Sequence, residues 1–227
     1  MEERSALAEL LRSARVSKDL IERIAQFGAA VLEANRRFNL TGAKTPPDIL
    51  PHLLDSLTIV PYVSGPLVDI GSGAGLPAIV LAIATGIEIT LIESTTKKAV
   101  FLETMLDELD LRGRVVPQRA ELAGRDPALR EYFACGTGRA ISSAPAVAEL
   151  LLPFLRIGGV AVMQRGAFLA GERDALVDAA PMLGGEVTEE IPLEGERCIL
   201  LIRKAAQTPP RFPRRIGVPE KRPLCFT

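Results

Sequence analysis

The chain has 227 residues, of which 48% are hydrophobic and 24% are charged, and its 27 basic side chains nearly balance 28 acidic ones. This composition is typical of a folded globular protein and excludes extensive disorder, and the length fits one domain with an extension. The formal net charge of -1 gives no global indication of a nucleic-acid partner, which local charge has to decide.

Cysteine content and apolar runs exclude several further classes. Cys135, Cys198 and Cys225 are too few and too scattered for a disulfide framework or a metal site, which fits a reducing, cytoplasmic setting. The longest apolar stretch, Leu76 to Ile87, is too short to cross a bilayer, and the acidic start MEERSALAEL lacks the basic residues of a signal peptide. We therefore expect no membrane segment and no bound metal.

Residues 1–62 have the pattern of a helical extension. Between Lys18 and Phe38 the apolar residues recur at the spacing of an amphipathic helix, with Ser17 as the expected N-cap. A shorter helical pattern precedes Ser17, and another runs from about Asp48 to Val60, after a break at the two preceding prolines.

Residues 63–207 alternate between short aliphatic runs and helical patterns, which predicts a doubly wound, mostly parallel, Rossmann-like α/β sheet with ligands at the carboxyl ends of its strands. The last two strands resemble a hairpin. The expected strands are Leu67 to Ile70, Glu88 to Ile92, Arg114 to Pro117, Arg139 to Ser142, Val160 to Gln164, Glu186 to Pro192 and Arg197 to Arg203.

The strongest motif is LVDIGSGAGLP, which begins at Leu67. A buried strand leads to Asp69, glycines follow at 71, 73 and 75, and a helix opens at Pro77. Glycines permit a tight turn and close approach of a ligand to the backbone, and a helix N-terminus presents free N–H groups. We therefore expect Asp69, Gly71, Gly73 and Gly75 to form a ligand-binding turn.

The nature of the ligand depends on the spacing of the glycines. A dinucleotide fingerprint requires a glycine where this chain has Leu76, which disfavours a nicotinamide oxidoreductase. The spacing resembles instead the DxGxGxG turn of S-adenosylmethionine (SAM) methyltransferases. Glu93, at the end of the second strand, fits a carboxylate that accepts hydrogen bonds from a ribose, although it is also typical of a charge at the start of a helix, which Ser94 or Thr95 would cap.

Residues 208–227 are rich in Pro and Arg and show no periodicity, so we expect a basic tail. From residue 211 onwards five basic residues face one acid, Glu220. Such a run is often only a solvated surface, but it also provides phosphate contacts. The residues expected to bind RNA are Arg165, Arg211, Arg214, Arg215, Lys221 and Arg222.

Several motifs together resemble one family, the bacterial 16S rRNA guanine-N7 methyltransferases, also called RsmG or glucose-inhibited division protein B. HLLDSL and the tail pattern PRRxGxPxKxPL narrow the resemblance to this family. The matching pieces are Asn39-Leu40-Thr41, HLLDSL at His52 to Leu57, DIGSGAGLP at Asp69 to Pro77, LIES at Leu91 to Ser94, Arg119-Ala120-Glu121, Arg139-Ala140 and FPRRIGVPEKRPL at Phe212 to Leu224.

The resemblance implies transfer of a methyl group from SAM to N7 of a guanosine in the decoding-region loop of 16S rRNA or of the assembled small subunit. By position, Gly71 and Leu76 look like contacts to the amino-acid end of SAM, Glu93 to its ribose, and Ala120 with Glu121 to its adenine. Arg139 looks like a family arginine at the edge of the cofactor or the substrate. We expect a monomer.

Two positions depart from the family pattern. Ala134 stands where the family often has an aspartate, and Arg165 stands where it has a lysine. Because N7 of guanine has a lone pair and no proton, methyl transfer requires positioning more than a general base. We therefore assign no catalytic residue, take His52 as structural, and consider Arg139 and Arg165 as candidate substrate contacts.

Two other functions remain open on the sequence. One is a SAM methyltransferase for a small molecule, which would turn over without RNA and would have a closed apolar pocket. The other is a non-catalytic, ribosome-associated protein that binds SAM without transferring its methyl group.

Overall fold

The computed structural model describes residues 1–139 and 142–226. The chain begins with helices α1 (Glu2–Ser13), α2 (Lys18–Asn35) and α3 (Pro46–Leu57), which confirms the expected helical start. Helix α3 begins at Pro46 rather than at Asp48, because proline favours the first turn of a helix and Thr45 with Asp48 forms a capping box. A short 3-10 helix, Val60–Tyr62, leads to the sheet.

The described residues form a seven-stranded sheet of order β3-β2-β1-β4-β5-β7-β6. Strands β1 to β5 pair in parallel, and β7 pairs antiparallel with both β5 and β6, so the doubly wound sheet and its terminal hairpin are confirmed. The strands are β1 (Leu67–Ile70), β2 (Ile89–Ile92), β3 (Gly113–Val116), β4 (Phe133–Gly138), β5 (Leu155–Arg165), β6 (Gly185–Pro192) and β7 (Cys198–Lys204).

The fourth strand differs from the expectation. It runs from Phe133 to Gly138, whereas Arg139 and Ser142 lie outside it, and residues 140 and 141 are outside the described residues. Gly136, a residue type that is uncommon within strands, is needed for packing, because a Cβ there would approach Leu151 Cδ1 to 2.7 Å. Strand β4 therefore lies in the middle of the sheet, beside β1.

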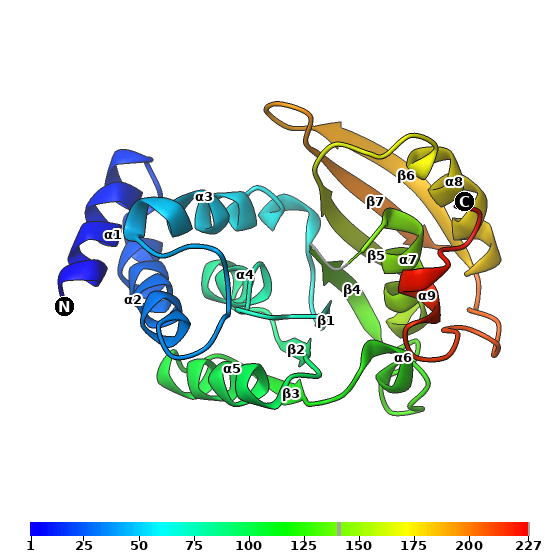
Figure 1. Ribbon diagram of the computed structural model, residues 1–227, viewed down its shortest axis with the longest axis horizontal. Coiled ribbons are helices and arrows are strands. Elements are labelled where there is room, and N and C mark those ends of the chain that lie inside the picture. The colour runs from blue at the N-terminus through cyan, green and yellow to red at the C-terminus, as the bar shows by residue number, and fades with distance from the viewer. Residues whose placement is uncertain (140–141, 227) are drawn as a thin grey trace.

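Helices cover both faces of the sheet (Figure 1). Helices α4 (Ala78–Thr85) and α5 (Thr96–Glu108) pack on one face and share a hydrophobic core with α1 to α3. Helices α6 (Ala120–Ala123), α7 (Ala144–Leu151) and α8 (Glu172–Met182) lie on the other side, with a 3-10 turn at Leu152–Phe154. Alternate residues of β1 face opposite cores, since Leu67 belongs to the first and Val68 to the second.

After β7 the chain returns across α7 and ends in a short helix, α9 (Val218–Lys221). This C-terminal segment, residues 205–226, is anchored to the domain. The Phe212 side chain is 3% exposed and belongs to the second core. Lys204, fully buried, donates a hydrogen bond to Leu152 O at 2.6 Å and another to Thr208 Oγ1. The segment is therefore packed, although its sequence shows no periodicity.

Candidate functional site

The turn between β1 and α4 has the conformation that its glycines were expected to provide. Gly71, Gly73 and Gly75 have φ values of 61°, 55° and 85°, a region that other residues rarely adopt. At Gly75 a Cβ would also approach Ile79 Cδ1 to 2.6 Å. The turn therefore places its backbone at the carboxyl end of β1, in the middle of the sheet.

Glu93 connects this turn to the next helix. Its Oε2 accepts a hydrogen bond from the Gly73 N–H at 2.9 Å, and its Oε1 accepts one from the Thr95 N–H at 2.7 Å. Thr95 is the N-cap residue of α5. The carboxylate thus supports the start of the helix and also reaches the glycine turn, whereas its contact to a ribose stays a prediction.

Asp69 lies beneath the turn. The Thr137 hydroxyl donates to its Oδ1 at 2.7 Å, and the Ser72 hydroxyl donates to its backbone carbonyl at 2.9 Å. Burial raises the pKa of the Asp69 carboxyl to about 7, against the opposing effect of the Thr137 hydrogen bond. Among the described residues Oδ2 has no hydrogen-bond partner. Asp69 lines neither of the cavities at the turn, so its position fits shaping the turn rather than touching a ligand.

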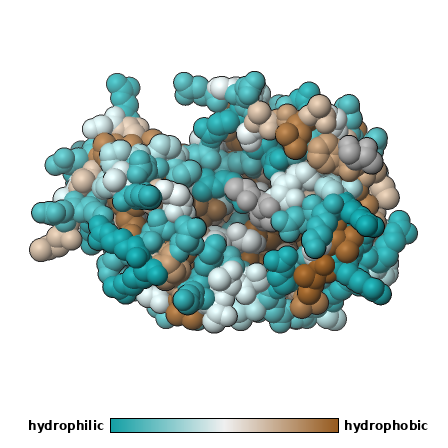
Figure 2. All heavy atoms as spheres, in the orientation of Figure 1, coloured by the Kyte–Doolittle hydropathy of each residue, from teal (hydrophilic) through white to brown (hydrophobic). Residues whose placement is uncertain are grey.

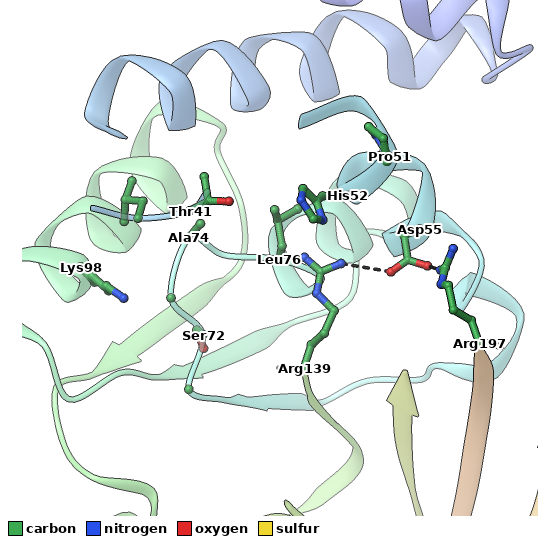
Figure 3. Close-up of a pocket in the computed structure, with 13 residues that line it drawn as sticks. Thr41, Pro51, His52, Asp55, Ser72, Ala74, Leu76, Lys98, Arg139 and Arg197 are labelled. Atoms are coloured by element: carbon green, nitrogen blue, oxygen red, sulfur yellow. Dashed lines mark hydrogen bonds and ion pairs between the residues drawn. The ribbon is translucent and has the colours of Figure 1, made fainter. Parts of the chain in front are cut away.

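Two cavities meet at Gly71. The larger one, the α3 cleft, has a volume of about 560 Å³ and lies between the glycine turn and α3 (Figure 3). The smaller one, the α6 pocket, has a volume of about 140 Å³ and lies on the other side of the turn. Among the expected contact residues, Gly73 and Leu76 line the α3 cleft, whereas Ala120 and Glu121 line the α6 pocket.

The α3 cleft is lined by cations held around one carboxylate. Arg139 Nη1 lies 3.2 Å from Asp55 Oδ2, and Arg197 forms an ion pair with Asp55 Oδ1 (Figure 3). Gln164 Nε2 donates to the Asp55 backbone carbonyl at 2.8 Å, which fixes α3 over the end of the sheet. Burial, together with the two arginines, lowers the pKa of His52 and favours its neutral form.

The sequence analysis did not identify Asp55, Arg197 or Lys98 as cleft residues. Arg197 directly precedes β7, in the loop of the β6–β7 hairpin, and this hairpin brings it beside α3. Lys98 lies in the first turn of α5 and lines the cleft from the opposite side (Figure 3). The usable signal was the HLLDSL motif, because it places Asp55 one helical turn after His52.

The α6 pocket is lined by acidic, basic and amide side chains, together with the apolar side chains of Ile92 and Leu150. Glu121 is 4% exposed, and its Oε1 accepts a hydrogen bond from the Gly217 N–H at 2.8 Å. Arg119 Nη2 lies 3.5 Å from the same oxygen. Gln118 and Glu220 also line the pocket, and Glu220 belongs to α9 of the C-terminal segment.

Two arginines that were expected to contact RNA are engaged within the protein. Arg165 donates to Ser142 O at 2.7 Å and to Glu172 Oε1 at 2.5 Å, and it lines neither cavity. Arg214 makes paired hydrogen bonds to the fully buried Glu149 carboxylate. These contacts fit roles in holding the fold. The expected RNA contacts with exposed side chains are Arg211, Arg215, Lys221 and Arg222.

No helix in residues 1–139 or 142–226 is long and apolar enough to cross a membrane. No group of three or more His, Cys, Asp or Glu side chains in the same ranges could hold a metal ion. The face shown in Figure 2 is mostly hydrophilic.

Sequence comparisons place the chain among rRNA methyltransferases. The family model described as rRNA small subunit methyltransferase G matches residues 20–198. A protein named ribosomal RNA small subunit methyltransferase G from Chloroflexus aggregans is 42% identical over 200 residues, which cover 84% of each chain. The protein of that name from Deinococcus deserti is 40% identical and covers 89% of each chain.

Structure comparisons support the fold. An O-methyltransferase from Bacillus cereus in complex with SAH superposes with a TM-score of 0.59 at 19% identity, over 88% of this chain and 97% of that one. A second structure, described as a putative O-methyltransferase from Klebsiella pneumoniae, gives a TM-score of 0.57 at 15% identity, over 91% of this chain and 100% of that one. These similarities show a shared α/β architecture.

Proposed function

The chain belongs to the rRNA small subunit methyltransferase G family, and from this premise we propose that it transfers a methyl group from SAM to N7 of a guanosine in the decoding-region loop of 16S rRNA. The observation that carries the proposal is the glycine turn at the junction of two cavities with opposite charge. One cavity suits a nucleoside, and the other suits an anionic substrate.

The residues around the turn fit SAM as the cofactor. We assign the adenine to the α6 pocket, which Ala120 and Glu121 line. Glu93 lies between Ile92 and Ser94, two residues that line this pocket, and its carboxylate accepts the Gly73 N–H of the turn. Gly71 and Leu76 line the α3 cleft, where backbone groups are available to the amino-acid end. The glycines leave the backbone accessible, because a Cβ at Gly73 would meet only Gly71 O, at 3.7 Å.

The chemistry of the transfer matches this set of residues. SAM supplies a methyl group on a positively charged sulfur. The guanine N7 has a lone pair and no proton, so the protein needs to hold the base in line with the methyl group rather than remove a proton. Arg139 and Arg197 offer N–H donors at the cleft, which suit guanine O6 or a backbone phosphate while N7 stays free to react. His52, kept neutral, adds no competing charge.

A basic groove next to the α3 cleft offers a path for the RNA backbone. This groove has a volume of about 540 Å³ and is lined by Arg36, Arg37 and Lys44. Thr41 lines both the groove and the α3 cleft. The ion pairs that engage Arg36 and Arg37 are largely exposed, so a phosphate can replace their partners at low cost. Arg211, Arg215, Lys221 and Arg222 provide a second set of exposed cations on the C-terminal segment.

The polar cleft favours RNA over a small molecule as the substrate. A methyltransferase for a small apolar compound needs a closed pocket, whereas the α3 cleft is lined by Lys98, Arg139 and Arg197. The assignment to ribosomal RNA implies a cytoplasmic enzyme, and we propose that it acts as a monomer, which light scattering of the purified protein checks.

The test uses SAM with a labelled methyl group and three substrates: 30S subunits that lack the modification, naked 16S rRNA, and no RNA. We expect N7-methylguanosine in at least one RNA sample and none without RNA. No N7-methylguanosine in either RNA sample refutes the proposal. Turnover without RNA indicates the small-molecule enzyme, and SAM binding without any transfer indicates the non-catalytic protein.

A further inference from the structure

The C-terminal segment is fixed to the methyltransferase core by buried contacts. The Arg214 N–H and its Nε each donate to Glu149 Oε1, at 2.8 and 2.9 Å, and Glu149 is fully buried. Arg130 donates to the carbonyls of Thr208 and Phe212 at 2.7 and 3.0 Å. A segment held by charge-assisted hydrogen bonds to buried groups has a defined position relative to the sheet.

This segment reaches the cavity that we assign to adenine. The Gly217 N–H donates to Glu121 Oε1 at 2.8 Å, and Glu220 lines the α6 pocket together with Gly71 and Ala120. The pocket is therefore bounded on one side by the glycine turn and on another by α9. Gly217 has a φ of 73°, which allows the backbone to turn there and direct its N–H toward Glu121.

The pocket presents hydrogen-bond acceptors of unequal availability. Glu121 is buried, and its Oε1 already receives the Gly217 N–H. Glu220 is exposed, and within the described residues no hydrogen bond or ion pair of its carboxylate is found. The edge of adenine carries an exocyclic amine, which is a donor that a carboxylate accepts.

We propose that residues 217–221 form the outer wall of the adenine site, and that the Glu220 carboxylate accepts a hydrogen bond from the exocyclic amine of adenine. This inference rests on the proposed SAM-dependent function. It gives the basic C-terminal segment a role in binding the cofactor, in addition to the RNA contacts that its charge indicates. Cofactor and RNA contacts then share one short helix, because Lys221 follows Glu220.

The first experiment compares the binding of S-adenosylhomocysteine to the wild type, to Glu220→Ala and to a chain that ends at Ile216, measured by calorimetry. The truncation leaves Phe212 and the Arg214–Glu149 pair in place. We expect affinity to fall about fivefold in Glu220→Ala and more than about tenfold in the truncated chain. Glu108→Ala, which removes an exposed glutamate from the end of α5, is the matched control and should bind normally.

The second experiment uses S-inosylhomocysteine, in which an oxygen replaces the exocyclic amine. The wild type should prefer the adenosyl compound by about tenfold, and Glu220→Ala should lose most of this preference. An equal loss of affinity for both compounds overturns the hydrogen bond to the amine. Thermal unfolding shows whether the truncated chain folds. If the truncated chain does not fold, the result for Glu220→Ala alone decides the test.

The outcomes separate this inference from the proposed function. If the wild type binds neither SAM nor S-adenosylhomocysteine, the proposed function fails. If the wild type binds SAM and S-adenosylhomocysteine, and Glu220→Ala and a folded truncated chain bind them equally well, the proposed function stands. The proposal that residues 217–221 form the outer wall of the adenine site is then refuted.

Discussion

The two cavities that meet at Gly71 differ in charge and in construction. The α3 cleft is lined by Lys98, Arg139 and Arg197 and by one carboxylate, that of Asp55, whereas the α6 pocket is lined by Glu121, Glu220 and Arg119. The net charge of the lining side chains is therefore positive on one side of the glycine turn and negative on the other. The difference teaches that a nearly neutral chain can carry cavities of opposite charge side by side, because its charged residues are distributed unevenly.

The first prediction concerns the glycine turn, which borders both cavities. In Gly73→Asp we expect SAM binding to weaken by more than about 100-fold, because the new carboxylate stands beside Glu93 and in the path of the ligand. A Cβ at Gly73 meets only Gly71 O at 3.7 Å, so the structural cost comes from the φ of 55° and is about 1 to 2 kcal/mol, which thermal unfolding measures. Calorimetry with SAM measures the effect.

A surface glycine provides the control for this prediction. A Cβ at Gly42 meets no atom within 4 Å, so Gly42→Asp introduces the same charge without narrowing the turn. It should bind SAM normally. Normal SAM binding by Gly73→Asp would place the cofactor elsewhere.

The second prediction concerns the charge behind the turn. The pKa of Asp69 is about 7 in the folded protein and 3.8 in the absence of burial, so the folded state holds its proton more tightly. Its stabilising contribution is complete below pH 3.8 and is lost as the pH rises through about 7. The free energy of unfolding of the wild type, relative to Asp69→Asn, should fall by on the order of 3 kcal/mol between about pH 5 and pH 8.

Urea unfolding at several pH values measures this difference. Asp107→Asn, on the exposed side of α5, is the control and should follow the wild type across the same range. A constant difference between the wild type and Asp69→Asn would mean that Asp69 is ionised in the folded protein. The turn would then have a negative charge close to Arg139.

The third and smallest effect sharpens the contrast between the cavities. Arg197→Ala should leave SAM binding within about twofold, weaken RNA binding about threefold to tenfold, and lower the salt dependence of RNA binding by about one unit of slope. Arg203→Ala removes an exposed arginine of β7, which is paired with Glu186 and lines neither cavity, and should change neither affinity. Equal loss of SAM and RNA binding in Arg197→Ala would show that the α3 cleft is not specific for the RNA.

Much of the fold could be predicted because hydrophobic periodicity reports which faces are buried. The alternation of strand and helix, the hairpin and the glycine turn all followed from local patterns. Strand β4 did not, because Gly136 is a packing requirement set by Leu151 and Leu155, residues outside the strand. A local pattern does not distinguish a glycine of this kind from a glycine in a loop.

The site was less predictable, because ion pairs between distant segments determine which charged side chains are available to a ligand. The sequence shows Arg165 and Arg214 only as basic residues, but Glu172 and Glu149 engage them inside the protein. Conversely, Arg197 lies at the cleft because the β6–β7 hairpin brings it to α3, where it forms an ion pair with Asp55. Backbone features of the turn are local and were visible, whereas ion pairs between distant segments were not.

The contact between Gly217 and Glu121 also has a consequence for how the protein matures. The two residues are separated by 96 positions, and β4 to β7 must form between them. During translation the glycine turn therefore emerges long before the segment that borders its neighbouring pocket. The α6 pocket can acquire this boundary only after β4 to β7 have been synthesised, whereas the glycine turn needs none of them.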